Sequence, residues 1–198
     1  MLVDLNIKDF ANKVATAEPV VPAGGCVTAL SGLMGVALLE MAVNSALGHS
    51  TGEKHEEFFQ NAKSQLTKLH TELLACIDGD AIAYQGVLDA YKLPNDCPEQ
   101  TQVRKANIQA AALSAIEIPL TIGEACLTAL EPGISMLPKV KRGVLGDLKI
   151  GLLFLRTCVE ASLAAARINL SLIYEADVVT SYQAKINELQ TKFDTQAM

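Results

Sequence analysis

The stretch that decides the fold is Pro19–Ala46, which reads PVVPAGGCVTALSGLMGVALLEMAVNSA. It opens with two prolines, passes through Gly24 and Gly25, and continues as a run of apolar and small residues over 27–47. A helix with apolar residues on nearly every face must be surrounded by protein or by lipid. The two glycines lack a Cβ, so the backbone before this helix can approach a ligand closely. The stretch therefore predicts a central buried helix that begins at a glycine turn.

The start of this helix is also a candidate binding site. The first backbone N–H groups of a helix have no intrahelical partner, so they can hold a carbonyl oxygen or an anion. A loop tied to a buried helix gives such a site a rigid support. We therefore expect a ligand at the turn formed by residues 22–26.

The remaining segments also have the pattern of helices. The expected ranges are 7–16, 26–47, 53–91, 98–131, 147–174 and 175–192. Asn6 and Asp147 are suitable N-caps, Gly48 should end the second helix, and Pro132 should end the fourth after a kink at Pro119. No segment shows the alternation of a β-strand. We predict one all-α domain over residues 1–198, a bundle of about six helices with long buried helices.

The composition excludes several classes of protein. The formal net charge is −6, whereas general nucleic-acid-binding proteins present a basic surface. The five cysteines are widely spaced and odd in number, which favours reduced thiols in a cytoplasmic protein over disulfides or a zinc site. His49 and His55 with Glu56 lack a tight metal-ligand spacing, so no metal is expected. No signal peptide is evident at the N-terminus.

The apolar run over 27–47 is long enough to raise the question of a membrane span. It contains Glu40 and Asn44, and no Lys or Arg flanks it closely. Membrane helices usually carry positive flanks and interfacial anchors. The sequence therefore favours a helix buried in protein, and no membrane partner is predicted.

Motifs along most of the chain resemble one family in the same order. The turn Pro22-Ala23-Gly24-Gly25-Cys26 is similar to a Pro-Gly-Gly-Gly-Ser/Ala turn in the domain shared by formiminotetrahydrofolate cyclodeaminases and methenyltetrahydrofolate cyclohydrolases. The segment over 31–35, Ser-Gly-Leu-Met-Gly, resembles the Gly-Ala-Met-Gly core of the family's next helix. Further similar segments follow at 80–84, 91–99, 117–120, 146–147 and 168–170.

The chain also departs from the family pattern. The turn has Ala23 and Cys26, and the segment after Gly48 lacks the family's Lys-rich stretch. Lys141-Arg142-Gly143-Val144 stands where the family has a Gly-Asn-x-Asn stretch, and Ala165 replaces an asparagine. These differences motivate a second hypothesis, a non-catalytic folate-binding or interaction protein on the same scaffold.

Asp80 is the leading catalytic candidate. It lies on the apolar stripe of the helix predicted over 53–91, and the Asp80–Tyr84 segment resembles the family's Asp-x-x-Ala-Phe. An inward-facing carboxylate is costly unless it is paired, hydrogen-bonded or protonated. Burial would raise its pKa toward a value useful for proton transfer. The alternative is a structural Asp bonded to a helix terminus or to an Arg.

For each of the other candidate site residues, a structural role is possible as well as a functional one. Asp147 is a second catalytic candidate, but helix capping alone accounts for it. Lys139, Lys141 and Arg142 could bind the glutamate tail of a folate or form an ordinary solvent-facing cluster. Cys26 could be a nucleophile at a helix start, although a space-filling role is the simpler interpretation.

The resemblance implies an enzyme of folate one-carbon metabolism. A cyclohydrolase adds water to a methenyl carbon and opens the ring, whereas a cyclodeaminase closes that ring and expels ammonia. Either reaction needs a positioned proton donor or acceptor, a role for Asp80, while Pro22, Gly24, Gly25 and Cys26 would hold the pterin. The resemblance further implies a homodimer, a reduced and possibly polyglutamylated folate as substrate, and no other cofactor.

Overall fold

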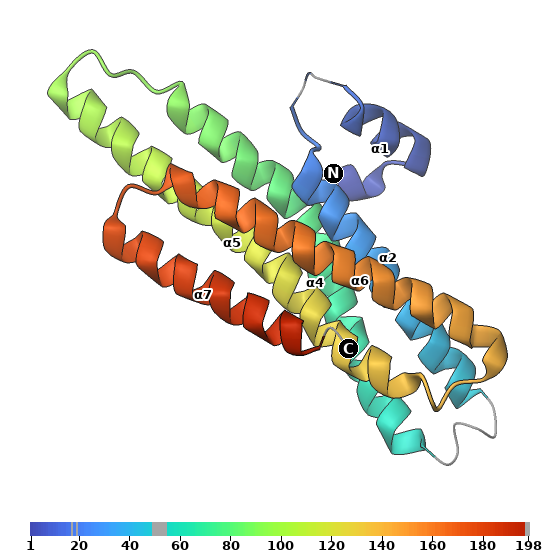
Figure 1. Ribbon diagram of the computed structural model, residues 1–198. Coiled ribbons are helices and arrows are strands. Elements are labelled where there is room, and N and C mark those ends of the chain that lie inside the picture. The colour runs from blue at the N-terminus through green and yellow to red at the C-terminus, as the bar shows by residue number, and fades with distance from the viewer. Residues whose placement is uncertain (17, 19, 49–54, 197–198) are drawn as a thin grey trace.

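The computed structural model describes residues 1–16, 18, 20–48 and 55–196. These residues form α-helices and two short 3-10 turns and contain no strand, which confirms the all-α prediction. The elements are η1 (Leu2–Asp4), α1 (Ile7–Val14), α2 (Gly24–Leu47), α4 (Glu56–Tyr91), α5 (Pro98–Met136), α6 (Arg142–Asn169), η2 (Leu170–Leu172) and α7 (Ala176–Thr195) (Figure 1).

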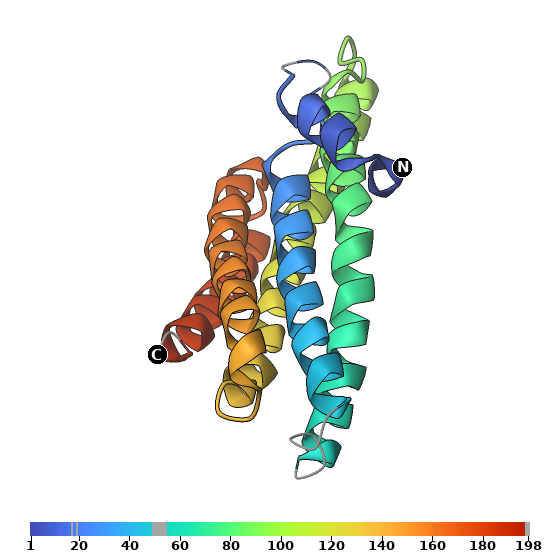
Figure 2. The same cartoon turned by 90° about the vertical axis from the view of Figure 1, so that its right-hand side faces the viewer.

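Four long helices form the body of the bundle. α2 packs between α4 and α6, and α5 packs against α4 and α6 from behind. α7 lies against α5 and α6, and α1 lies near the start of α2 (Figures 1 and 2). The end of α4 and the start of α5 project beyond α2 and α6 as a two-helix hairpin. Tyr84 and Tyr91, near the end of α4, are 39% and 41% exposed because they lie on this hairpin.

Glycines allow α2 and α6 to pack closely against each other. A Cβ at Gly35 would lie 3.0 Å from the carbonyl oxygen of Gly151, and a Cβ at Gly151 would lie 3.0 Å from that of Gly35. Any larger side chain at either position would push the two helices apart. This contact fixes α2 against α6 and leaves leucines, among them Leu39 and Leu155, to fill the space beside it.

One strip of α2 is not buried, contrary to the prediction for this helix. Val27, Met34 and Met41 are 36%, 45% and 41% exposed. α4 and α6 flank α2 on either side, and no described element lies in front of it (Figure 2). By length and composition α2 and α5 could each cross a membrane, although half of the apolar window of α2 is buried inside the bundle.

Several helix ends are confirmed and others are wrong. The Asn6 side chain accepts a hydrogen bond from the Asp9 N–H at 2.9 Å, as expected of an N-cap, and α2 ends before Gly48. The predicted stop at Pro132 is wrong, because α5 continues to Met136. Pro119 and Pro132 are both buried, so tertiary packing outweighs a proline cost of about 3 kcal/mol each.

The predicted cap at Asp147 is also wrong. α6 begins at Arg142 with Lys141 in the N-cap position, which places Asp147 in its second turn. The helix starts earlier because the chain needs only a short turn after α5, over residues 137–141. α6 ends at Asn169, where η2 takes over.

Candidate functional site

Asp80 of α4 lies against the first turn of α2. The Cys26 thiol donates a hydrogen bond to Asp80 Oδ2 over 3.2 Å, and the Cys26 backbone N–H also donates to this carboxyl group. A Cβ at Gly25 would overlap the Asp80 carboxyl group, whereas a Cβ at Gly24 would meet nothing within 4 Å. The glycine at 25 therefore makes room for Asp80, and the glycine at 24 leaves the backbone open to a ligand.

The start of α2 supplies donors for that ligand. The N-cap residue is Ala23, and no side chain caps the helix. The backbone N–H groups of Gly24 and Gly25 belong to the first turn and have no intrahelical acceptor. Gly24 is exposed and Pro22 is buried, so the proline anchors the turn while the glycine faces outward. The predicted turn and the predicted carboxylate thus come together in the structure.

The surroundings of Asp80 shift its acidity. Burial raises the pKa of its carboxyl group above the usual range, and the two hydrogen bonds from Cys26 only partly oppose this rise. A carboxyl group with a raised pKa exchanges its proton more readily near neutral pH. Asp80 is therefore suited to accept a proton from a reacting group and to return it.

Cys26 is a hydrogen-bond donor rather than a nucleophile. Its side chain is completely buried, and burial raises the pKa of the thiol to about 12, with a further contribution from Asp80. Only the thiolate is reactive, and at neutral pH this thiol stays protonated.

Thiol labelling should reflect this environment. Cys97 is partly exposed, whereas Cys26, Cys76, Cys126 and Cys158 are buried. We expect iodoacetamide to modify Cys97 first in the native protein and to reach Cys26 only after unfolding, as mapped by peptide mass spectrometry. A Cys97→Ser variant should then show almost no native labelling. Fast native labelling of Cys26 would contradict the structure of this turn.

Asp147 does not lie near Asp80 within one chain. α2 and α6 run antiparallel, since the Cys158 thiol donates to the Thr28 carbonyl at 3.3 Å while Gly35 meets Gly151. Ten residues of α2 from Gly25 to Gly35 and four residues of α6 from Gly151 back to Asp147 together span about 20 Å. The two carboxylates therefore cannot both act on one carbon atom in the same chain.

The basic cluster of Lys139, Lys141 and Arg142 lies at the same end of the bundle as Asp147, far from the glycine turn. Lys141 and Arg142 are exposed at the start of α6, about 30 Å from the glycine turn by the same helix rise. Lys139 donates to the Ser135 carbonyl at 2.6 Å and lies over the Phe58 ring at 4.7 Å. Lys139 therefore has local structural partners, and the cluster is separate from the turn.

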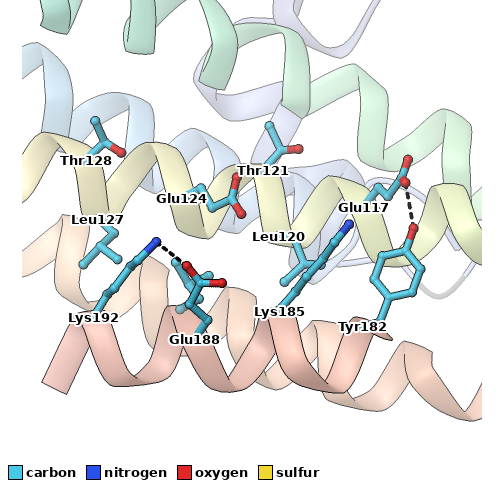
Figure 3. A pocket seen from close by; sticks show the side chains of 11 residues that line it. Glu117, Leu120, Thr121, Glu124, Leu127, Thr128, Tyr182, Lys185, Glu188 and Lys192 are labelled. Atoms are coloured by element: carbon cyan, nitrogen blue, oxygen red, sulfur yellow. Dashed lines mark hydrogen bonds and ion pairs between the residues drawn. The ribbon is translucent and has the colours of Figure 1, made fainter. Parts of the chain in front are cut away.

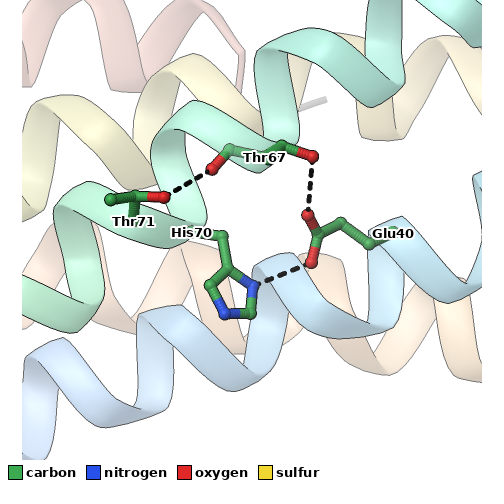
Figure 4. Close-up of polar contacts among 4 residues, drawn as sticks. All are labelled: Glu40, Thr67, His70 and Thr71. Atoms are coloured by element: carbon green, nitrogen blue, oxygen red, sulfur yellow. Dashed lines mark hydrogen bonds and ion pairs between the residues drawn. The ribbon is translucent and has the colours of Figure 1, made fainter.

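Two polar features were missed by sequence reasoning. Glu40, in the apolar α2, lies 2.8 Å from His70 Nδ1 of α4 and also accepts a hydrogen bond from Thr67 at 3.3 Å (Figure 4). This pair explains how α2 tolerates a carboxylate. A lone Glu in an apolar helix was a signal that such a partner exists, but the sequence does not identify His70.

The second missed feature is a groove of about 640 Å³ between α5 and α7 (Figure 3). The Tyr182 hydroxyl donates to Glu117 across it at 2.7 Å, and Lys192 pairs with Glu188 at 2.7 Å. None of the predicted site residues lines this groove. Across the described part of the chain, no group of three His, Cys, Asp or Glu side chains could hold a metal ion; His49 lies outside that part.

Comparison with known proteins gives consistent matches. A family model described as Formiminotransferase-cyclodeaminase matches residues 6–188. A methenyltetrahydrofolate cyclohydrolase of Methylorubrum extorquens is 31% identical over 150 residues, which are 74% of this chain and 70% of that protein. A formimidoyltransferase-cyclodeaminase of Mus musculus is 28% identical over 204 residues, covering 99% of this chain. The chain spans only 36% of that mouse protein.

A solved structure shows the same fold. Formiminotetrahydrofolate cyclodeaminase from Thermotoga maritima superposes with a TM-score of 0.87. The match covers 99% of this chain and 93% of the other at 18% sequence identity. The helical arrangement is therefore shared despite low identity.

Proposed function

Because the chain belongs to the formiminotransferase-cyclodeaminase family, we propose that it is an enzyme that acts on the one-carbon unit of a tetrahydrofolate derivative. The observation that carries this proposal is the Asp80 carboxyl group held against an open glycine turn. The pterin lies at the turn, where the free N–H groups of Gly24 and Gly25 donate to its carbonyl and ring acceptors. Its one-carbon unit then lies next to Asp80.

Asp80 supplies the proton transfer that both candidate reactions require. In hydrolysis, ionised Asp80 takes a proton from the attacking water, and a C–O bond forms at the methenyl carbon. The acid then returns the proton to the ring nitrogen as the C–N bond breaks, and the hydroxyl group on the carbon releases its own proton to solvent as it becomes the formyl carbonyl. In cyclodeamination, the neighbouring folate nitrogen attacks the carbon of the protonated formimino group. Asp80 takes the proton of the attacking nitrogen and gives it to the departing nitrogen, whose C–N bond breaks to release ammonia. The Methylorubrum extorquens relative, of which the match covers 70%, is named a cyclohydrolase. This name favours hydrolysis over cyclodeamination as the reaction.

An absorbance assay with two substrates tests the proposal. With methenyltetrahydrofolate, a cyclohydrolase removes the methenyl absorbance faster than buffer alone. With the formimino derivative, a cyclodeaminase creates that absorbance and releases ammonia in equal amount. Binding of reduced folate without turnover of either substrate would support the non-catalytic alternative. Neither binding nor turnover would contradict both hypotheses.

The basic cluster suggests that the length of the folate's glutamate tail affects binding affinity. A pterin at the turn leaves Lys141 and Arg142 about 30 Å away, so a single glutamate does not reach them. We propose that only an extended polyglutamate tail gains affinity from these side chains. Replacing both with Gln should weaken binding of a long-tailed folate several-fold and leave the monoglutamate unchanged. Equal effects on both ligands would contradict this role.

We further propose that the protein works as a cytoplasmic homodimer with no resident metal or cofactor other than its folate substrate. The family resemblance and the exposed apolar strip of α2 support the homodimer. Buried reduced cysteines support a reducing compartment. Sedimentation at micromolar concentration tests the assembly independently of the chemistry.

A further inference from the structure

A group of exposed apolar side chains lies on and beside α2. We call this surface the α2 face; it consists of Val27, Met34 and Met41 of α2, Leu74 of α4, and Ile150 and Phe154 of α6. Each of these side chains is between 36% and 46% exposed. α2 lies between the other two helices, and beyond its start, where α1 lies nearby, no described element lies in front of it (Figure 2). Monomeric soluble proteins rarely present so long an apolar surface.

The strip of α2 itself carries no unpaired charge, whereas Asp147 lies on the same side of α6 as Ile150 and Phe154, three and seven residues before them. Between Val27 and Met41 the single charged residue of α2 is Glu40, and it lies against His70 rather than outward (Figure 4). Met34 and Leu74 also line an apolar pocket of about 350 Å³ between η1, α1, α2 and α4. The uncharged strip of α2 can meet its own copy without repulsion, and the pocket can accept a side chain from it.

We propose that the α2 face is the contact between two copies of this chain, related by a two-fold axis that crosses α2 near Met34. This inference rests on the homodimer proposed above, but not on the folate chemistry. Val27 and Met41 are each seven residues from Met34, so the strip is symmetric about that residue. With the helices antiparallel, Met34 meets its own copy and Val27 meets Met41 of the partner subunit. Two-fold contacts of this kind require such self-complementarity.

The charges at the ends of the bundle favour the antiparallel arrangement. A parallel arrangement would bring the exposed Lys141 and Arg142 of both copies to the same end, where they repel. The antiparallel arrangement separates the two clusters by the length of α2 and also opposes the two helix dipoles.

The size of the face is sufficient for a stable dimer. α2 has 24 residues, hence a length of about 36 Å. Neighbouring helix axes are about 8–10 Å apart, so three helices present a width of about 20 Å. The product, about 700 Å², is close to the roughly 800 Å² per partner that stable interfaces bury.

A charge at the centre of the face tests the proposal. Met34→Glu should raise the dimer dissociation constant by at least about 100-fold in analytical ultracentrifugation, because the carboxylate would be buried against its own copy. Since Met34 is partly exposed in one chain, the variant should keep its helicity. The matched control is Ile82→Glu, a similar change at a residue that is 71% exposed on α4.

Cross-linking tests the direction of the contact. In a Cys97→Ser background, a chain carrying both Val27→Cys and Met41→Cys should form a covalent dimer, while either single variant should not. In a parallel arrangement each single variant would cross-link, which would overturn the antiparallel assignment.

A dimer that survives Met34→Glu and is lost with Ile82→Glu would show that the α2 face is not the contact between the two copies. It would leave the homodimer itself in place. A monomeric wild type, including one that binds lipid vesicles through this face, would overturn the homodimer as well and leave the proposed chemistry untouched.

Discussion

Replacing Asp80 with Asn should lower turnover by at least about 100-fold while leaving the helical fold intact. Asn keeps the shape of the side chain and can still accept the hydrogen bonds of Cys26, but it cannot transfer a proton. The measurement is kcat with the substrate that wild type turns over, together with the midpoint of denaturant unfolding. Unchanged turnover in a folded variant would assign Asp80 to structure alone.

The same variant should change how stability depends on pH. The pKa of Asp80 is raised in the folded chain, so near the usual Asp value of about 4 the native state binds more protons than the unfolded state. Wild-type stability should therefore fall as pH rises from that value through the raised folded pKa, and then level off. Asp80→Asn lacks this decrease, so its stability relative to wild type should rise across that window. A difference that stays constant with pH would contradict the burial of this carboxyl group.

Gly25→Ala should be the most damaging of the single-methyl additions to the turn. The methyl group would overlap the Asp80 carboxyl group, so either α2 or Asp80 must move. We expect a loss of about 1–3 kcal/mol in the free energy of unfolding, as for other overpacked sites, with loss of turnover.

The matched control is Gly24→Ala, one residue earlier. This methyl group meets nothing within 4 Å, and the backbone of Gly24 does not have a positive φ, so alanine fits. Its effect on stability should stay within about 1 kcal/mol in either direction. Chemical denaturation of both variants and wild type gives the comparison. Equal effects at the two positions would contradict the close approach of Asp80 to Gly25.

Features set by local periodicity could be predicted from the sequence. The long apolar runs gave the helices, Asn6 and Gly48 marked helix ends, and the position of Asp80 on an apolar stripe indicated an inward carboxylate. The resemblance in the turn then placed that carboxylate and Gly25 in one candidate site.

Features set by packing between distant segments could not be predicted. The composition of α2 does not reveal which strip its neighbours leave open, and the prolines of α5 are tolerated only because their surroundings are packed. Asp147 is a suitable N-cap by residue type, whereas the short turn after α5 moves the start of the helix to Arg142. The distance between Asp147 and Asp80 depends on the antiparallel packing of α2 and α6.

The position of the site can be tested most directly by hydrogen–deuterium exchange with and without a reduced folate. The N–H groups of Gly24 and Gly25 lack intrahelical acceptors and should exchange quickly in the free protein. The ligand should slow exchange in peptides that cover residues 20–30 and 76–86, and leave those over 137–147 unchanged. Protection confined to 137–147 or to the groove between α5 and α7, or no protection at a saturating concentration, would contradict a folate site at the Asp80 turn.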